Sequence, residues 1–381
     1  MAVGVLPPLR SIHVMQLRSM VVAIVMCASL THLASAFHPH ITFRSPSFHV
    51  YIEDTDAYGV MYNANYLRAY ERALHTVSFK PPSYVTSFHC DGDHDGAEDN
   101  SSVDLLDGGA LDHAGWFVLG ATDHKFKGSP PLGGEYIIEG ELLERNCDED
   151  NSCLEQWKLV MRSPIVENVD DDVNSKPTIY NTSTLTIASP TKSGELPHQY
   201  HPNAPPFDES SGATVRSKFS PYRDEFDPTL PHRMPLRNVL NLFERARTDF
   251  LGGPDALRKM ESEDNVVWVV TGIDHCELCN LGEAGWEEES NGDGVSASLV
   301  QCLPGQSVTV KTNFVSRRGA KIFDCNQMLL VPAWDEEICE YRNRRLAQAT
   351  ITMMALDAKK RRPTRKVPQW FVDKINGGED D

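Results

Sequence analysis

The sequence predicts an α+β protein built from two tandem copies of one unit, in which a helix lies on an antiparallel sheet. Segments 48–74 and 219–247 share a layout, because Tyr51 and Tyr222 each lie five residues before an aspartate. The offset between the copies is 171 residues at both positions (51 to 222 for the tyrosine). A repeat at a fixed spacing indicates a duplicated structural unit. In each copy one helical segment precedes several strand-like segments, which is typical of a helix on one face of an antiparallel sheet.

The helix of the first copy is expected within 62–79, where apolar residues recur at intervals of three and four and form the stripe that packs on the sheet. Runs rich in β-branched and aromatic residues then predict four strands in each copy. These runs are 116–124, 131–144, 154–163 and 182–190 in the first copy, and 267–275, 303–317, 322–332 and 346–357 in the second.

Length and charge limit the function classes. A chain of 381 residues predicts two ordinary domains. A net charge of −18 argues against nucleic-acid binding, which needs a basic face. The acidic residues collect in short polar runs that are expected in solvated loops, and no run has the spacing of a calcium-binding loop, so no metal site is expected.

The nine cysteines include one CxxC pair, Cys276 and Cys279. A structural zinc site needs a second such pair at suitable spacing, and the sequence has none. We expect the two thiols to be reduced and partly buried, with redox control as the alternative.

The N-terminus has the residue pattern of a targeting segment. Arg10 and Arg18 precede an apolar run that is too short to span a bilayer, and Ala34-Ser35-Ala36 follows, so residues 1–36 are expected to be a signal peptide. The Ala-Ser-Ala-Phe junction resembles the cleavage motif of two-part plastid targeting signals in algae with secondary plastids. We therefore expect import into a plastid, with secretion as the alternative. No later segment is apolar enough to make an integral membrane protein.

These observations divide the chain. The expected parts are a signal peptide (1–36), a short transit-like segment (37–46), a first domain (47–190), a linker rich in Pro and Ser (191–214), a second domain (215–370) and an acidic tail (371–381). The linker is long enough for the two domains to pair side by side.

Residues 50–73, VYIEDTDAYGVMYNANYLRAYERA, resemble the opening motif of the 4-hydroxybenzoyl-CoA thioesterase family of hot-dog proteins. The likeness is sharpest at Asp54, Thr55, Asp56, Gly59, Tyr62, Asn65, Tyr66, Glu71, Arg72 and Ala73. The resemblance implies two hot-dog domains that form an internal pseudo-dimer. It implies hydrolysis of acyl-CoA or acyl-carrier-protein thioesters, with no cofactor beyond the carrier of the acyl group. Assembly into a further homo-oligomer stays open.

The resemblance also implies the site residues. Asp56 is the expected catalytic carboxylate, either as nucleophile or as the base that activates water. The backbone N–H at Asn63 is expected to polarise the thioester carbonyl, with Tyr62 and Gly59 forming the turn. The chemistry supports these roles, because a helix N-terminus presents N–H groups and a positive dipole end to a developing oxyanion. Gly59 lets the backbone turn tightly into the helix.

The second copy departs from this motif. Asp227 keeps the acidic position, but Gly59 has no counterpart and prolines stand at 228, 231 and 235. Since proline fixes the backbone dihedral and removes a donor, the turn must differ. We expect Asp227 to be the weaker candidate, in a half that supports the first site.

Other acidic and basic residues are further site candidates. Glu71 and Glu244 are expected to make structural ion pairs, although a helix glutamate is the catalytic acid in some hot-dog enzymes. Neighbouring strand residues face opposite sides of a sheet, so neither Asp–His pair is expected to form a shared site. These pairs are Asp123–His124 and Asp274–His275, and His232 is a further lone candidate.

Two basic clusters could contact phosphates of coenzyme A. The first comprises Arg317, Arg318 and Lys321, and a solvated turn is the alternative for it. The second is KKRRPTRK at 359–366, which is expected to be a charged strand edge or tail, with phosphate contact as the lesser alternative.

Two other functions fit the same fold. One is a non-catalytic protein that binds acyl thioesters. The other is a dehydratase acting on 3-hydroxyacyl thioesters, which would need an Asp–His couple such as Asp227 with His232.

Overall fold

A computed structural model describes residues 41–55, 61–78, 117–147, 153–164, 177–189, 207, 212–226, 233–279, 301–317, 321–335, 339–364 and 366–376. Apart from Ile41, they belong to one compact unit that comprises Thr42–Ser87 and Asp95–Asp381.

Each half of this unit has one long helix, and its described strands, six in the first half and five in the second, pair into a common sheet. The first half comprises β1 (Thr42–Arg44), β2 (Phe48–His49), η2 (Ile52–Asp54), α2 (Asn63–Ser78), β3 (Phe117–Phe126), β4 (Glu135–Cys147), β5 (Cys153–Arg162) and β6 (Ile179–Ser189). The second comprises β7 (Ala213–Phe219), η4 (Arg223–Glu225), α3 (Leu236–Phe250), α4 (Gly253–Lys259), η5 (Met260–Asp264), β8 (Val266–Leu278), β9 (Val308–Arg317), β10 (Ile322–Asp335), β11 (Glu340–Asp357) and α5 (Gln369–Ile375).

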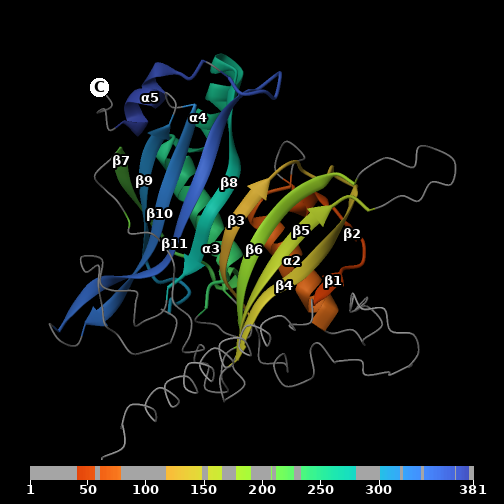
Figure 1. Cartoon of the computed structure of the whole chain (residues 1–381). Helices are drawn as coiled ribbons and strands as arrows, with labels where there is room; N and C mark the ends of the chain where they lie inside the picture. Colours follow the sequence, from red (N-terminus) through yellow and green to blue (C-terminus); the bar gives the residue numbers. More distant parts are fainter. Residues whose placement is uncertain are drawn as a thin grey trace, which may run out of the picture. The chain divides into compact units, whose positions relative to one another are not determined.

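One antiparallel sheet runs through both halves, in the order β1-β4-β5-β6-β3-β8-β11-β10-β9-β7, with β2 on β4 (Figure 1). The halves meet where β3 pairs with β8, with Thr122 opposite His275 and His124 opposite Ile273. The order of strands outward from this junction is equivalent on the two sides, since β6, β5, β4 and β1 correspond to β11, β10, β9 and β7. This is the predicted α+β architecture of two tandem hot-dog domains.

The helices lie against the sheet through the predicted apolar stripes, and Figure 1 shows α2 within the curve of the first half's strands. In α2, Leu67, Tyr70 and Ala73 are completely buried, and Phe243 is completely buried in α3. Burial of one such Leu or aromatic side chain stabilises the fold by roughly 1.5–3 kcal/mol. None of the helices in the described ranges is long and apolar enough to cross a bilayer.

The same hydrogen-bonded turn precedes both helices. Asp54, at the end of η2, is buried, and its carboxylate accepts a hydrogen bond from the Tyr51 N–H at 3.1 Å. Glu225, at the end of η4, accepts one from the Tyr222 N–H at 2.7 Å. The first aspartate of the Asp-Thr-Asp motif is therefore a structural residue that holds the chain before the helix.

The structured part extends beyond three of the predicted boundaries. β1 lies inside the segment expected to be transit-like, yet it pairs with β4, with Phe43 opposite Gly140. β7 begins at Ala213, within the predicted linker. In the predicted acidic tail, Phe371 is completely buried and stacks on Trp268 with ring centroids 4.3 Å apart. These contacts join segments that are distant in the sequence, so local composition does not predict them.

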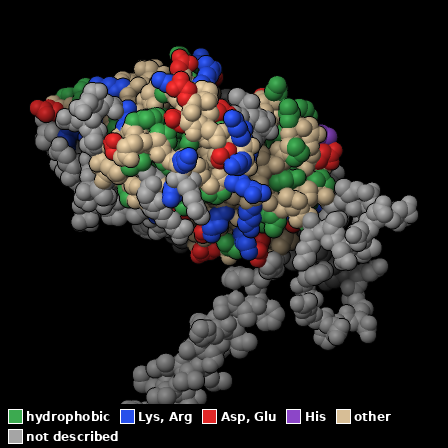
Figure 2. All heavy atoms as spheres, turned by 90° about the horizontal axis from the view of Figure 1, so that it is seen from above, with side chains coloured by type: hydrophobic (Ala, Val, Ile, Leu, Met, Phe, Trp, Pro, Cys, Tyr) green, Lys and Arg blue, Asp and Glu red, His purple; other side chains and the backbone are tan. Residues whose placement is uncertain are grey.

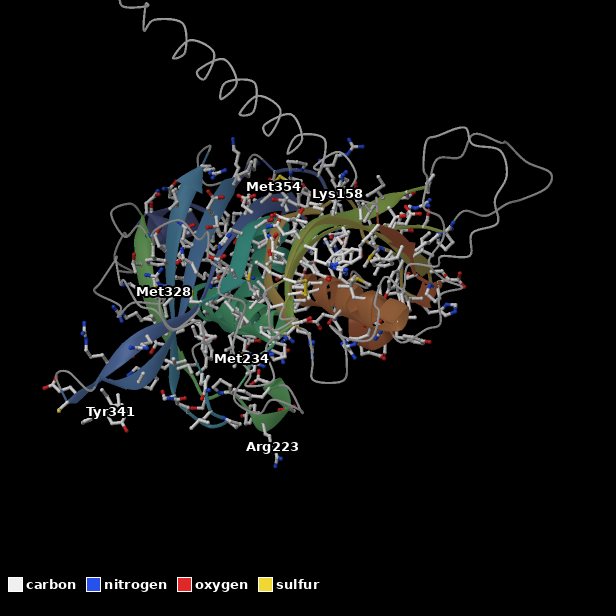
Figure 3. The ribbon with its side chains drawn as sticks, turned by 60° about the horizontal axis from the view of Figure 1, so that its bottom comes forward. Lys158, Arg223, Met234, Met328, Tyr341 and Met354 are labelled. Carbon is white, nitrogen blue, oxygen red and sulfur yellow. A yellow bond between two sulfur atoms is a disulfide. The ribbon has the colours of Figure 1, made fainter. Side chains whose placement is uncertain are left out.

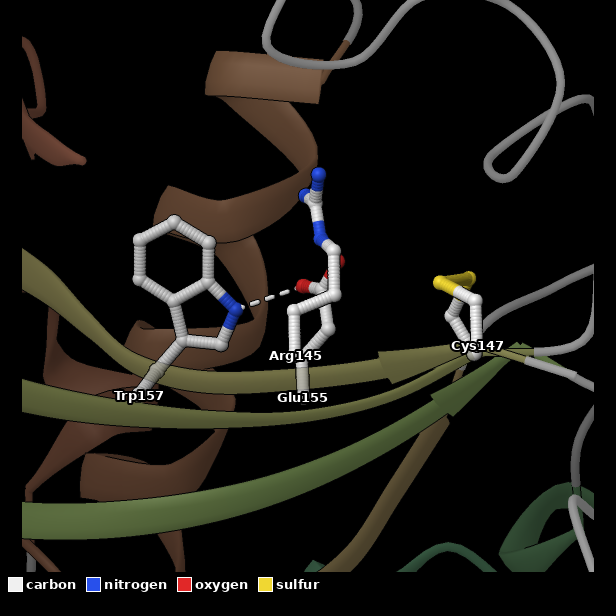
Figure 4. The surroundings of a disulfide bond; sticks show 5 residues. Arg145, Cys147, Glu155 and Trp157 are labelled. Carbon is white, nitrogen blue, oxygen red and sulfur yellow. Dashed lines mark hydrogen bonds and ion pairs between the residues drawn. A yellow bond between two sulfur atoms is a disulfide. The ribbon is translucent and has the colours of Figure 1, made fainter. Parts of the chain in front are cut away.

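Among the described residues, Cys147 and Cys153 form a disulfide across the β4–β5 hairpin, which was not predicted (Figure 4). Beside it Glu155 accepts hydrogen bonds from Trp157 Nε1 and Arg145 Nε, each at 2.7 Å. Cys276 and Cys279 are both buried thiols. Burial raises the pKa of the Cys276 thiol, so it stays protonated and unreactive.

The β10–β11 hairpin extends past its neighbours in the sheet, and Figure 3 shows Tyr341 at its projecting end. Trp334 packs edge-on against Tyr341 across the two strands, with ring centroids 5.3 Å apart.

Candidate active site

The start of α2 adjoins a cavity of about 800 Å³ that lies between the two halves. Tyr62 and Asn63, at the beginning of the helix, line it. The opposite wall comes from the second half, through α3, α4, η5 and β8. This volume lies in the range of small-molecule sites, roughly 300–1,000 Å³. The predicted oxyanion position therefore opens into a space large enough for an acyl group.

Most of the cavity wall is apolar. The apolar lining comprises Met61, Tyr66, Phe126, Leu251, Leu257, Met260, Val266, Val267, Trp268, Val269, Val270, Met353 and Leu356. A surface of this kind favours a hydrocarbon chain or ring over a polar ligand.

Two residues fix the polar end of the cavity across the interface between the halves. The Tyr62 hydroxyl, before α2, donates a hydrogen bond to the carboxylate of Glu244 in α3. Burial, followed by the charge of Glu244, raises the pKa of Tyr62, so its hydroxyl stays a donor at neutral and moderately alkaline pH. The Glu244 side chain keeps 33% of its surface exposed. Its carboxylate is thus reachable from the cavity while it is held beside the helix start.

Arg247 lies one turn further along α3 and lines the same cavity. Its guanidinium is 3.4 Å from Glu244 Oε2 and also donates to Gln327 Oε1. Gln327 in turn donates to Phe243 O at 2.8 Å and Thr312 Oγ1 at 3.0 Å. A buried charge is tolerated only when it is paired and hydrogen-bonded, and this chain of contacts satisfies Arg247. The second half therefore supplies a fixed positive charge to a site that begins in the first.

The start of α3 has an equivalent arrangement, but there the helix glutamate of the other half is held in an ion pair. Glu71 and Glu244 each stand eight residues after the first residue of their helix. Glu71 pairs with Arg237, the second residue of α3, and its side chain is only 13% exposed. Pro235 and Leu236 occupy the places of Tyr62 and Asn63. The structural interpretation of Glu71 is confirmed, whereas Glu244 faces the cavity.

Arg233 adds a further contact near the start of α3, because its guanidinium lies 3.2 Å from the centroid of the Phe117 ring. None of residues 233–239 is among those that line the large cavity. The two helix starts therefore differ in this structure, as the prolines of the second copy suggested.

Several predicted site residues lie outside the described residues. These are Asp56, Gly59, Asp227, His232 and Arg318. The residues that flank Asp56 and Gly59 are described. Thr55 and Met61 form a β-bridge, and the Met61 N–H donates to Ser129 Oγ at 2.8 Å. The Tyr62 N–H donates to Asp54 O at 3.0 Å. The chain on both sides of the Asp56 turn is thus fixed to the body of the protein.

The two Asp–His pairs do not form acid–base couples. Asp123 is exposed and pairs with Lys125, whereas His124 is buried against Tyr66, Tyr70 and Phe126. In the second pair, Asp274 is exposed and His275 is buried beside Glu277, 3.0 Å away.

The first predicted phosphate cluster lies apart from this cavity. Arg317 pairs with the buried carboxylate of Asp324, and the Lys321 carbonyl accepts a hydrogen bond from Ala355 N at 2.9 Å. Neither residue is among those that line the cavity, whereas Lys127 and Arg361 are. Within the described ranges, no group of three or more His, Cys, Asp and Glu side chains could hold a metal ion.

Sequence reasoning missed Arg247 and Gln327. A signal for Arg247 was present, because the copies are offset by 173 residues in the helix and its counterpart is Leu74, a buried residue of the apolar stripe. A cation in place of a core leucine indicates a buried polar partner. Gln327 had no such signal, since it lies inside a strand that reads as core.

Comparison with known proteins gives structural likenesses only. No protein-family model matches the sequence, and no curated protein sequence matches it. A protein described as an oleoyl thioesterase from Lactobacillus plantarum has a similar structure, with a TM-score of 0.48 and 10% identity over 83% of this chain and 96% of that one. The 12:0-ACP thioesterase from Umbellularia californica gives a TM-score of 0.43 and 12% identity over 81% of this chain and 93% of that one.

A Mycobacterium tuberculosis protein described as having a double hotdog fold gives a TM-score of 0.36 and 9% identity, over 63% of this chain and 75% of that one. At identities this low the likeness concerns the chain trace and not the side chains of the site.

Proposed function

We propose that the protein hydrolyses acyl thioesters of coenzyme A or of an acyl carrier protein, at a single site between its halves. The observation that carries the proposal is the apolar cavity of about 800 Å³ that ends at the start of α2, with Glu244 and Arg247 of the other half beside it. The first N–H groups of a helix have no partner within that helix, so they are available to a ligand oxygen. An acyl thioester fits this space, because its acyl group suits the apolar cavity and its carbonyl oxygen can accept a hydrogen bond at the helix start.

In the proposed reaction the thioester carbonyl oxygen lies at the Asn63 N–H, where the helix dipole stabilises the charge that develops on it. Asp56 either attacks the carbonyl carbon or takes a proton from water that does so, as the family resemblance implies. The carbon–sulfur bond then breaks. Where water attacked, the thiolate takes the proton that Asp56 had accepted and the acid is released; where Asp56 attacked, the thiolate takes a proton from solvent, and water then hydrolyses the acyl–Asp56 anhydride, which releases the acid and restores the carboxylate. The reaction needs no cofactor beyond the acyl carrier.

Tyr62 and Glu244 hold the polar end of the cavity in this proposal. The tyrosine hydroxyl and Arg247 both contact the Glu244 carboxylate, so its position beside the α2 start is fixed. Asp227 is assigned a lesser role or none. The targeting interpretation, import into a plastid with secretion as the alternative, is proposed for residues 1–36 on the sequence pattern alone.

The test is thiol release from a panel of acyl-CoA and acyl-carrier-protein thioesters by wild type, Asp56→Asn and Asp227→Asn. We expect Asp56→Asn to lower kcat by at least about 100-fold, a loss typical of removing one catalytic group. Asp227→Asn should stay near wild type. Equal losses in both variants would argue for two equivalent sites.

A matched pair separates the roles of the helix glutamates. Glu244→Gln should lower kcat because it weakens the polar end of the cavity, whereas Glu71→Gln should leave kcat near wild type and act on stability through Arg237. If both variants keep full kcat, Glu244 has no part in the reaction.

The alternative is a non-catalytic protein that binds acyl thioesters, and it is favoured by the contacts that already engage Glu244. It predicts tight binding of a thioester without turnover in the same assay. For a dehydratase, nothing among the described residues supplies the Asp–His couple, since Asp123 and His124 face apart.

A further inference from the structure

The basic segment after β11 is a built turn at the rim of the cavity, where a charged tail or strand edge was expected. The Asp357 N–H donates to Arg362 O at 2.8 Å, and the Arg361 N–H donates to Asp357 O at 2.8 Å. The Asp357 carboxylate accepts hydrogen bonds from the N–H groups of Lys359 and Lys360, at 3.1 and 2.8 Å. These hydrogen bonds fix the backbone of the turn, from which four exposed cations project at positions 359–362.

The turn is also tied to the body of the protein. Ala358 N donates to Asn265 O at 2.9 Å, and Thr364 N donates to Ala355 O at 3.1 Å. In the adjoining acidic segment η5, Glu263 pairs with Lys259 at 3.8 Å. The orientation of the turn relative to the cavity is therefore set by the fold.

The cations of this turn fall into two groups. Arg361 is exposed and also lines the cavity, as does Lys127 from the end of β3. Lys359, Lys360 and Arg362 are exposed but are not among the residues that line it. Figure 2, which looks down on this end of the molecule, shows Lys and Arg side chains gathered in a band on the surface.

We propose that Lys359, Lys360 and Arg362, together with Arg361 and Lys127 at the rim, dock an acidic carrier protein that presents its acyl group on a phosphopantetheine arm. This proposal rests on the proposed function and names the carrier. A small nucleotide would take its contacts within the cavity, which only two of these cations reach. Cations spread over the outer surface suit a protein partner of opposite charge. The chain as a whole has a net charge of −18, so a group of cations distinguishes this face from the rest of the protein.

The arm explains why the docking cations can stand outside the cavity. A flexible arm lets the acyl thioester enter the apolar space while the protein that carries it stays at the rim. The phosphate at the base of the arm would pass between Arg361 and Lys127, where two cations can pair with it.

The test compares three carriers of one acyl group as substrates of the same protein variants. Lys360→Glu/Arg362→Glu changes two docking cations that do not line the cavity, and Lys158→Glu/Arg223→Glu is the control with the same change in net charge (both control residues are labelled in Figure 3). Lys158 is 56% exposed and Arg223 is exposed. The substrates are one acyl group on an acidic bacterial acyl carrier protein, on coenzyme A and on pantetheine.

For Lys360→Glu/Arg362→Glu we expect kcat/KM on the acyl carrier protein to fall at least about tenfold, because association between opposite charges is lost. Hydrolysis of acyl-pantetheine and acyl-CoA should stay within about twofold of wild type, and so should every substrate with the control variant. A loss confined to acyl-CoA would assign the turn to nucleotide phosphates and overturn the proposal. Equal losses on all three substrates would overturn it as well.

Binding separates this proposal from the proposed function. If wild type hydrolyses none of the three thioesters, the enzyme assignment fails, and fluorescence anisotropy of the labelled holo carrier protein still tests the docking surface. Binding by wild type and by the control, but not by Lys360→Glu/Arg362→Glu, supports the surface. Absence of binding by wild type, or equal binding by all three, overturns it.

Discussion

His124 is a buried histidine whose protonation should make the first half sensitive to acid. It lies in β3 among Tyr66, Tyr70 and Phe126, and neither ring nitrogen has a hydrogen-bond partner among the described residues. Burial lowers the pKa of His124 from 6.5 to about 3. Between these pH values the unfolded chain binds a proton that the folded chain does not, so the free energy of unfolding falls as the pH falls.

The size of the effect follows from the width of that window. Each pH unit within it corresponds to about 1.4 kcal/mol, so a shift from neutral pH to pH 4.5 should remove about 3 kcal/mol through His124 alone. His124→Leu keeps a similar volume and has no group to protonate. At pH 7.5 its stability should lie near that of wild type, because it removes a polar group without hydrogen bonds.

Urea unfolding at pH 7.5 and pH 4.5 measures this difference. We expect His124→Leu to lose about 3 kcal/mol less than wild type between the two pH values. His49→Leu is the control, because its side chain is 54% exposed and it also removes one histidine. The same acid loss in wild type and in His124→Leu would refute the reasoning.

Two further predictions concern stability. Cys147→Ser/Cys153→Ser removes a disulfide that closes a short loop, with a sequence separation of 6 residues, so urea unfolding should show a loss of about 2 kcal/mol, and a reductant should destabilise wild type but not the variant. Arg237→Met leaves the Glu71 carboxylate, 13% exposed, without its ion-pair partner, and should cost up to about 3 kcal/mol, less than for a fully buried pair because Arg237 is itself 33% exposed. Adding Glu71→Gln should recover part of that loss, and no recovery would mean that the pair is not coupled.

Most of the fold could be predicted from the sequence because both copies show one helical segment followed by several strand-like segments. The runs that predicted strands form β3–β6 and β8–β11, and the apolar stripe that starts near Tyr66 is the buried face of α2. The additional elements could not be predicted. The short strand β1 is held by one buried side chain, Phe43, against Gly140, and such a contact between distant segments leaves no periodic pattern.

The site could be predicted only in part. Tyr62 and Asn63 were found because they belong to a local motif at the start of one helix. Glu244 was expected to be structural, since its position beside Tyr62 depends on how the two halves pair. Arg247 was missed although the repeat aligns it with Leu74, a buried residue of the apolar stripe, which indicates a buried cation. Contacts between the two halves cannot be predicted from the residue spacing within either copy.

We propose that one site operates, at the start of α2. Tyr62→Pro/Asn63→Leu gives the first copy the residues of the second, and Pro235→Tyr/Leu236→Asn makes the reverse exchange in the second copy. Thiol release should be measured for both after circular dichroism confirms that they fold. We predict that the first variant loses at least about 100-fold in kcat/KM while the reverse exchange stays near wild type. Similar losses in both, or none in the first, would contradict a single site at this helix.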